Sequence, residues 1–171
     1  MVQDNELVPQ TGTQIDIVMP GAGHAMVREL ILEYARALGV DLCFQNFPQE
    51  LETLQTLYGP PGGFMLVARR SAAYVGCVGV RRIGADTCEM KRLYVRPQWR
   101  GAGIGRALAT DAIRRARGEG YRRMLLDTLS HMTEARRLYA SLGFRQCAAY
   151  YPSPLQGTIY LELLMGEAPL T

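Results

Sequence analysis

The chain has 171 residues and a formal net charge of +3, and 48% of its residues are hydrophobic. This length suits a single domain with its own core, and the small net charge gives no indication of nucleic-acid binding. No apolar run approaches the roughly 20 residues that span a bilayer, so membrane insertion is not indicated either. Residues 1–13 lack the pattern of a secretory signal. We therefore expect a cytoplasmic protein with a disordered lead-in over 1–13 and one domain over 14–166.

The cysteines are widely scattered and form no C-x-x-C pair, and the two histidines complete no metal-ligand spacing. We therefore expect free thiols in a reducing compartment and no metal site. The cysteines are Cys43, Cys77, Cys88 and Cys147.

The first half of the sequence predicts an antiparallel sheet preceded by two helical regions. Alternating apolar residues indicate strands, and apolar residues spaced three or four apart indicate helices. Pro60 to Gly63 is a strong turn signal between these two parts. In chain order we expect a strand over 14–19, a helix over 22–38, a shorter helical region over 41–58 and strands over 64–68, 73–80 and 87–95.

The second half predicts a parallel crossover. A helix is expected over 104–117, with Ile104, Leu108, Ala112, Ile113 and Ala116 facing inward. A strand over 123–128 follows, then a helix capped by Thr133 and ended by Gly143, and strands over 144–148 and 158–164. Antiparallel strands followed by a β-α-β crossover make a three-layer α/β domain with a mixed sheet. The expected buried stripe of the last helix is Ala135, Leu138, Tyr139 and Leu142.

Residues 89–108 (EMKRLYVRPQWRGAGIGRAL) read as a strand, a basic turn with three glycines and the start of a helix. Free N–H groups at a helix N-terminus bind anions, and glycines let a ligand approach the backbone closely. The turn lacks both the Gly-Lys-Ser/Thr of a Walker loop and the G-x-G-x-x-G spacing of a Rossmann loop. It indicates a site for the pyrophosphate of a coenzyme, and a purely structural turn is the alternative.

Three segments in this order resemble the GNAT superfamily, the Gcn5-related N-acetyltransferases. Gln98–Gly105 is similar to the family's Q/R-x-x-G-x-G/A loop, Glu89–Val95 to its fourth strand, and Ala135–Phe144 to its A-x-x-L-Y-x-x-x-G-F segment. The resemblance covers roughly residues 14–165. It implies a three-layer α/β/α fold whose mixed, mostly antiparallel sheet is splayed between strands 4 and 5.

The resemblance also implies acetyl-CoA as the acetyl donor. Backbone groups of Leu93, Tyr94 and Val95 would bind the pantetheine arm, and the Val95 N–H would stabilise the tetrahedral oxyanion. Met132 stands where many members carry an asparagine that contacts the coenzyme, so this contact must differ or be absent. The backbone N–H groups implied for the pyrophosphate belong to Arg100, Gly101, Ala102, Gly103, Ile104, Gly105 and Arg106.

Glu89 is a candidate general base, because an amine with a pKa near 10 must lose a proton before it attacks. A glutamate six residues before Val95 matches the base of the histone-acetylating members of the superfamily. It would act directly or through a water, and an ion pair with a nearby Arg or Lys is the alternative role. Strand alternation puts Glu89 on the same side as Lys91, Leu93 and Val95 unless a β-bulge intervenes.

Tyr139 occupies the position of the family's general-acid tyrosine, which protonates the leaving thiolate; core packing is the alternative. For the acceptor we expect contacts from Arg92, Asp127 and Tyr151, with Tyr150 beside them. Arg92 would suit an acceptor that carries a carboxylate, because guanidinium–carboxylate pairing is bidentate. For Asp127, hydrogen bonding at the end of its strand is the alternative.

These features predict an N-acetyltransferase that moves an acetyl group from acetyl-CoA to a primary amine of a small molecule. The alternatives are acetylation of a peptide or protein amino group, and a non-catalytic acyl-CoA-binding or regulatory module. A nucleotide-binding module is a third reading. The sequence does not identify the acceptor, and it leaves a homodimer open.

Overall fold

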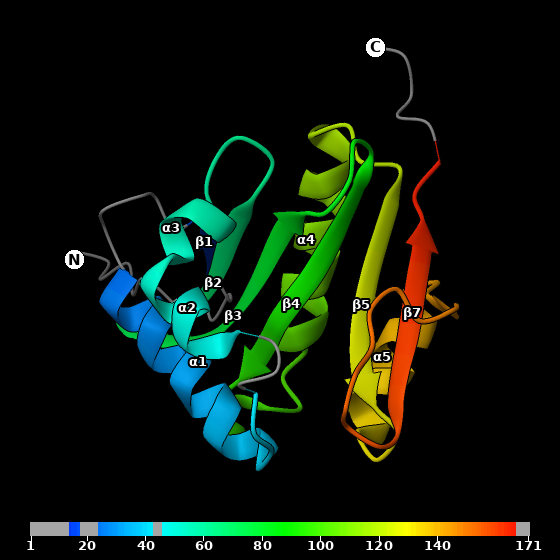
Figure 1. The fold of residues 1–171 in the computed structure, drawn as a ribbon. Helices are drawn as coiled ribbons and strands as arrows, with labels where there is room; N and C mark the ends of the chain where they lie inside the picture. The colour runs from blue at the N-terminus through cyan, green and yellow to red at the C-terminus, as the bar shows by residue number, and fades with distance from the viewer. Residues whose placement is uncertain (1–13, 18–23, 43–45, 167–171) are drawn as a thin grey trace, which may run out of the picture.

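The computed structural model describes residues 14–17, 24–42 and 46–166, so the expected lead-in over 1–13 and Cys43 lie outside the described residues. Figure 1 shows one sheet with helices on both faces. In chain order the elements are β1 (Gln14–Ile17), α1 (His24–Leu38), α2 (Phe47–Glu52), α3 (Leu54–Leu57), β2 (Phe64–Arg70), β3 (Ala73–Arg82), β4 (Thr87–Val95), η2 (Pro97–Trp99), α4 (Ile104–Gly118), β5 (Arg123–Leu129), α5 (Thr133–Ser141), β6 (Arg145–Gln146) and β7 (Thr158–Leu164).

The described residues form a seven-stranded sheet in the order β1-β2-β3-β4-β5-β7-β6. Neighbouring strands are antiparallel except β4 and β5, which are parallel. Helices α1, α2 and α3 cover one face, and α4 and α5 cover the other (Figure 1). This arrangement confirms the expected three-layer α/β fold with a mixed, mostly antiparallel sheet. In the part of the chain that the structure describes, no helix has the length and apolar character to cross a membrane.

Each face of the sheet has its own hydrophobic core. On the α4 face, all five apolar residues that we expected to point inward are buried against β2, β3 and β4. On the other face, Val27, Leu30 and Ile31 of α1 pack with Val67 and Cys77. Helical spacing therefore predicted the buried side of α4 correctly, because residues three and four apart share one side of a helix.

The two central strands separate along their length, as expected for strands 4 and 5. Backbone pairing of β4 with β5 is confined to Thr87–Glu89 and Arg123–Leu125. Beyond Glu89 the rest of β4 has no ladder partner in β5, which leaves one edge of the strand open to a ligand.

A β-bulge lies at Arg92, whose φ of 58° falls in the left-handed region. Between the pairs Cys77–Tyr94 and Gly79–Lys91, two residues of β4 stand opposite one residue of β3. The extra residue keeps Arg92 on the α1 face with Lys91 and turns Leu93 toward the α4 core. Glu89 therefore does not share a side with Leu93 and Val95, which corrects simple strand alternation.

Three smaller expectations also need correction. The region 41–58 is interrupted at Thr53, whose hydroxyl donates 2.7 Å to the Gln49 carbonyl and so competes with helical bonding. Thr133 is the first residue of α5 and not its cap; the cap position is Met132, which makes no side-chain cap bond. Of the expected stripe on α5, Tyr139 is buried and the other three residues are half-buried.

Candidate active site

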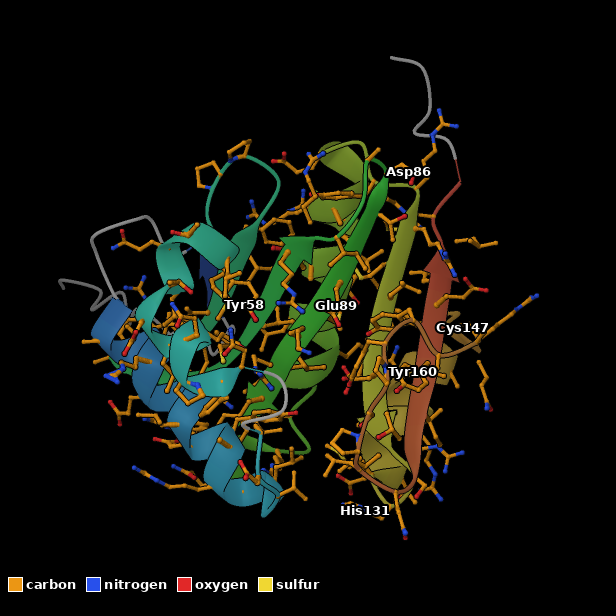
Figure 2. All side chains as sticks on the ribbon, in the orientation of Figure 1. Tyr58, Asp86, Glu89, His131, Cys147 and Tyr160 are labelled. Atoms are coloured by element: carbon orange, nitrogen blue, oxygen red, sulfur yellow. The ribbon has the colours of Figure 1, made fainter. Side chains whose placement is uncertain are left out.

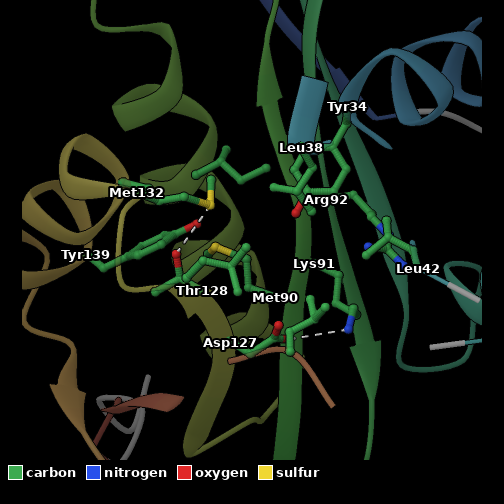
Figure 3. Close-up of a pocket in the computed structure, with 14 residues that line it drawn as sticks. Tyr34, Leu38, Leu42, Met90, Lys91, Arg92, Asp127, Thr128, Met132 and Tyr139 are labelled. Carbon is green, nitrogen blue, oxygen red and sulfur yellow. Dashed lines mark hydrogen bonds and ion pairs between the residues drawn. The ribbon is translucent and has the colours of Figure 1, made fainter. Parts of the chain in front are cut away.

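The opening between β4 and β5 contains two adjoining pockets. Both are lined by Tyr34 and Leu38 of α1, Leu93 of β4, and Met132 and Ala135 at the start of α5. We call the first the inner pocket (Figure 3); Met90, Lys91, Arg92, Asp127, Thr128, Tyr139 and Leu155 also line it. The second, the outer pocket, is also lined by Tyr94, Val95, Arg100, His131, Thr133 and Glu134.

The glycine loop lies where the outer pocket meets the start of α4. Gly101 and Gly103 have φ values of 78° and 76°, and open space surrounds the position of a Cβ at both. Helix α4 begins at Ile104 without a side-chain cap. The N–H groups of its first turn lack intrahelical acceptors, so they fit a diphosphate. The side chain of Ile104 is buried in the core, which leaves only its backbone for a ligand.

The two arginines that flank this loop are tied to neighbouring elements. Arg100 donates from Nε to the Val95 carbonyl at 3.0 Å, and its guanidinium lies 5.9 Å from the Tyr94 ring centroid. Arg106 donates to the Ser141 hydroxyl at 2.8 Å and so links α4 to α5. Both contacts fix the loop relative to the strand and helix beside it, and both guanidinium groups add positive potential near the helix N-terminus.

Tyr139 packs in the core and also lines a pocket. Its ring packs edge-on against Phe144, with centroids 5.7 Å apart, and it also lines the inner pocket with Leu93 and Met132. Burial raises its pKa well above that of an ordinary tyrosine. The phenol therefore stays protonated at neutral pH, and its O–H is available as a hydrogen-bond donor.

Glu89 is 1% exposed and has three partners around its carboxylate. Arg81 approaches Oε2 with Nε and Nη2, both at 2.7 Å, and the Tyr150 hydroxyl donates to Oε1 at 2.8 Å. Lys91 lies 3.6 Å from Oε1. The ion pair that was the alternative role is therefore present, and the carboxylate does not line either pocket directly.

Aromatic side chains stand beside these charges. Tyr150, Tyr151 and Tyr160 meet edge to face, with ring centroids 5.3 Å apart in each pair, and the Tyr160 hydroxyl donates to the Tyr151 carbonyl at 2.8 Å. Lys91 lies 6.0 Å from the Tyr151 ring centroid. Figure 2 shows Glu89 on β4 and Tyr160 on β7, on the two sides of β5.

Arg92 lies at the inner pocket, but its guanidinium is bound within the protein. Nε and Nη2 donate to the two carboxylate oxygens of Glu50 at 2.8 and 2.6 Å, and Phe47 and Tyr34 cover its faces. Burial alone would raise the pKa of Glu50, but the hydrogen bond and charge of Arg92 outweigh it and lower that pKa. The bidentate partner that we expected in the acceptor is thus supplied by α2.

Several pocket residues were not anticipated as such. Tyr34 and Leu38 fit the apolar stripe of α1, and helical spacing does not distinguish a core position from a pocket wall. Met132 lines both pockets, and its sulfur lies 3.8 Å from the Thr128 hydroxyl (Figure 3). Strand alternation put Lys91 on the same side as Glu89 but did not predict that it lines a pocket.

Comparison with known proteins identifies the family. The family model described as "Acetyltransferase (GNAT) family" matches residues 40–144, more than half of the chain. An uncharacterized N-acetyltransferase of Schizosaccharomyces pombe is 44% identical over 140 residues, which cover 81% of this chain and 86% of that protein. An IAA acetyltransferase of Azospirillum brasilense is 40% identical over 146 residues, covering 80% of this chain and 88% of that protein.

The fold agrees with this match. A GNAT family acetyltransferase from Elizabethkingia anophelis, solved with acetyl-CoA bound, superposes with a TM-score of 0.66 at 22% identity, covering 89% of this chain and 97% of that one. At that identity the likeness shows the fold. With the family match and the two relatives, the chain belongs to the GNAT family of acetyltransferases, which confirms the expected enzyme class and acetyl-CoA as the acetyl donor.

Proposed function

We propose that the protein transfers the acetyl group of acetyl-CoA to a primary amine of a small molecule by direct attack of the amine on the thioester. The observation that carries this proposal is the position of the two pockets. They begin where β4 and β5 stop pairing, and they lie beside an uncapped helix N-terminus on one side and a buried tyrosine on the other.

The open edge of β4 supplies the binding groups for the donor. Backbone groups of Leu93, Tyr94 and Val95 bond the pantetheine arm as an added strand would bond a sheet edge. The N–H groups of residues 100–106 hold the pyrophosphate at the start of α4. With the coenzyme bound in this way, we expect the thioester in the inner pocket, which Tyr139 and Met132 line.

Three groups of the chain stabilise the oxyanion or transfer protons during the reaction. The Val95 N–H donates to the oxyanion that forms when the new C–N bond is made. Glu89 accepts the proton that the amine loses, through the Tyr150 hydroxyl or a water, because the residue is buried, with 1% of its surface exposed. Tyr139 gives its proton to the thiolate when the C–S bond breaks, which its neutral phenol can do.

A small acceptor suits the inner pocket better than an extended peptide. Leu42, after α1, and Leu155, in the loop before β7, both line this pocket. The same loop carries Tyr150 and Tyr151, which stand beside Glu89 and Lys91. These walls favour a compact amine that is enclosed on several sides.

The test is a panel of primary amines, peptides with free amino termini and intact proteins, each mixed with acetyl-CoA and followed by release of free thiol. We expect turnover with small amines. Turnover confined to peptides or proteins would contradict the small-molecule acceptor. Calorimetric binding of acetyl-CoA without turnover of any acceptor would instead favour the non-catalytic module.

We also propose that residues 14–166 form a single catalytic domain and that it works in the cytoplasm. Cys77, Cys88 and Cys147, the cysteines in the part of the chain that the structure describes, are free thiols, in keeping with a reducing compartment. Limited proteolysis tests the first proposal. Light scattering on the purified protein distinguishes a monomer from the homodimer that the sequence leaves open.

A further inference from the structure

Lys91 is the only lysine in the sequence; the other positively charged side chains of the Lys/Arg type are all arginines. Its side chain is 6% exposed and lines the inner pocket. An ammonium is a compact charge with three donors, whereas a guanidinium is a wide planar fork. A lysine at this place therefore presents a positive charge to the pocket and still leaves room for a ligand.

Among the residues that the structure describes, no anionic oxygen makes a short contact with this ammonium. The anionic oxygens within ion-pair distance there are Asp127 Oδ1 at 3.4 Å and Glu89 Oε1 at 3.6 Å (Figure 3 shows the first). Both distances exceed the roughly 2.7–2.9 Å of a strong charge-assisted bond. Glu89 is already held at 2.7 Å by Arg81 and at 2.8 Å by Tyr150. Lys91 therefore has donor capacity left for an anionic oxygen in the pocket.

The charges around the pocket are balanced before any acceptor binds. The ion pairs are Arg92–Glu50, Arg81–Glu89 and Lys91–Asp127. A simple ammonium would add an unbalanced positive charge to this site, and burying an unpaired charge is costly. An acceptor that carries a carboxylate close to its ammonium adds no net charge.

We propose that the acceptor is an amine that also carries a carboxylate, as an α-amino acid does. Lys91 binds the carboxylate, and Asp127 receives the ammonium before it loses its proton. The 3.4 Å contact between the two side chains opens to admit the acceptor. Lys91 thus takes the role that the sequence had suggested for Arg92. This inference rests on the proposed function and narrows its substrate class.

The experiment compares matched triples of acceptors: an α-amino acid, its carboxamide, and the amine that lacks the carboxyl group. Each is assayed with acetyl-CoA by thiol release, and the readout is the ratio of kcat/KM between the carboxylate and the carboxamide. We expect the carboxylate to be favoured about 10- to 100-fold, the range of a hydrogen bond to a charged group.

Variants assign the preference to Lys91. We expect Lys91→Met to bring the ratio to about one, chiefly by raising KM for the carboxylate, and Lys91→Arg to keep a part of it. If Lys91→Met does not fold, Lys91→Met combined with Asp127→Asn removes the pair together. Arg137→Met, which removes a positive charge from the exposed side of α5, is the matched control and should keep the ratio of the natural protein.

The outcomes separate this inference from the proposed function. Turnover of all three members of a triple at equal kcat/KM, or a ratio that Lys91→Met leaves unchanged, would overturn the inference alone. Binding of acetyl-CoA without turnover of any small amine would overturn the proposed function and the inference with it.

Discussion

Lys91 Nζ lies 3.4 Å from Asp127 Oδ1, and each residue is two positions beyond the last pair, Glu89 and Leu125, that joins β4 to β5. A side-chain ion pair therefore stands two residues past the point where the backbone pairing of these strands ends. Unlike a backbone pair, this contact is made by side chains alone, so its two charges are available to a ligand that carries both signs. A pair of opposite charges therefore lines the inner pocket close to the point where β4 and β5 separate.

Replacing Tyr139 with phenylalanine should lower kcat by about 100-fold and leave KM nearly unchanged, because the phenol gives its proton only as the C–S bond breaks. Thiol-release kinetics measure both constants. The melting temperature should change little, since the ring keeps its contact with Phe144. Equal turnover numbers in the two proteins would remove Tyr139 from the mechanism.

Tyr121→Phe is the matched control for this variant. The Tyr121 hydroxyl donates to the Gly62 carbonyl, and Tyr121 does not line either pocket. Its loss should cost about 1 kcal/mol of the free energy of unfolding and leave kcat intact. We therefore expect Tyr139→Phe to lose activity but not stability, and Tyr121→Phe to lose stability but not activity. This contrast separates a catalytic hydroxyl from a structural one.

Gly103→Glu should abolish acetyl-CoA binding, because a carboxylate side chain would stand among the N–H groups proposed for the pyrophosphate. Gly120→Glu is the control: Gly120 also has a positive φ and open space around its Cβ position, but it follows the other end of α4. Each substitution should cost about 1–2 kcal/mol of stability for the left-handed backbone. Calorimetry that finds equal affinity in both variants would contradict the loop assignment.

The Glu89→Gln variant tests whether Glu89 acts as the general base or serves only as the ion-pair partner of Arg81. If Glu89 takes the proton, kcat/KM should fall by about 100-fold or more at neutral pH. The deficit should shrink as the pH approaches the acceptor's own pKa, near 10 for an alkylamine, because the amine then loses its proton unaided. The measurement is kcat/KM of both proteins from pH 7 to pH 9.5. A deficit of constant size at every pH would assign Glu89 to the structural pairing with Arg81.

Glu50→Gln should lower the free energy of unfolding by about 3–5 kcal/mol at pH 7, because it leaves the buried guanidinium of Arg92 without a counter-ion. The folded-state pKa of Glu50 is lowered, so its contribution is complete above the ordinary carboxyl pKa of about 4.3 and is lost as the pH falls through the folded-state value. Urea denaturation at pH 7 and near pH 3 should therefore show a smaller difference between the two proteins at the lower pH.

The exposed Glu119→Gln change, at the end of α4, is the control for that measurement and should alter stability by less than about 0.5 kcal/mol. Equal stability of Glu50→Gln and the natural protein at pH 7 would show that Arg92 does not depend on this carboxylate.

Local sequence patterns determined much of this protein. The spacing of Ile104, Leu108 and Ala112 defined the buried side of α4, because neighbours along one side of a helix are three or four residues apart. Gly101 and Gly103 indicated the loop because glycine adopts a positive φ without strain. The bounds of β4 and β7 also follow from alternation and flanking turns.

Tertiary structure alone decided which charges meet. Arg92 binds Glu50 from 42 positions away, Tyr150 reaches Glu89 across 61, and Lys91 reaches Asp127 across 36. One inserted residue, the bulge at Arg92, then changed which side chains of β4 share a face. Propensity and period describe a chain only over a few residues, whereas these contacts depend on the register between strands and on where two of them part.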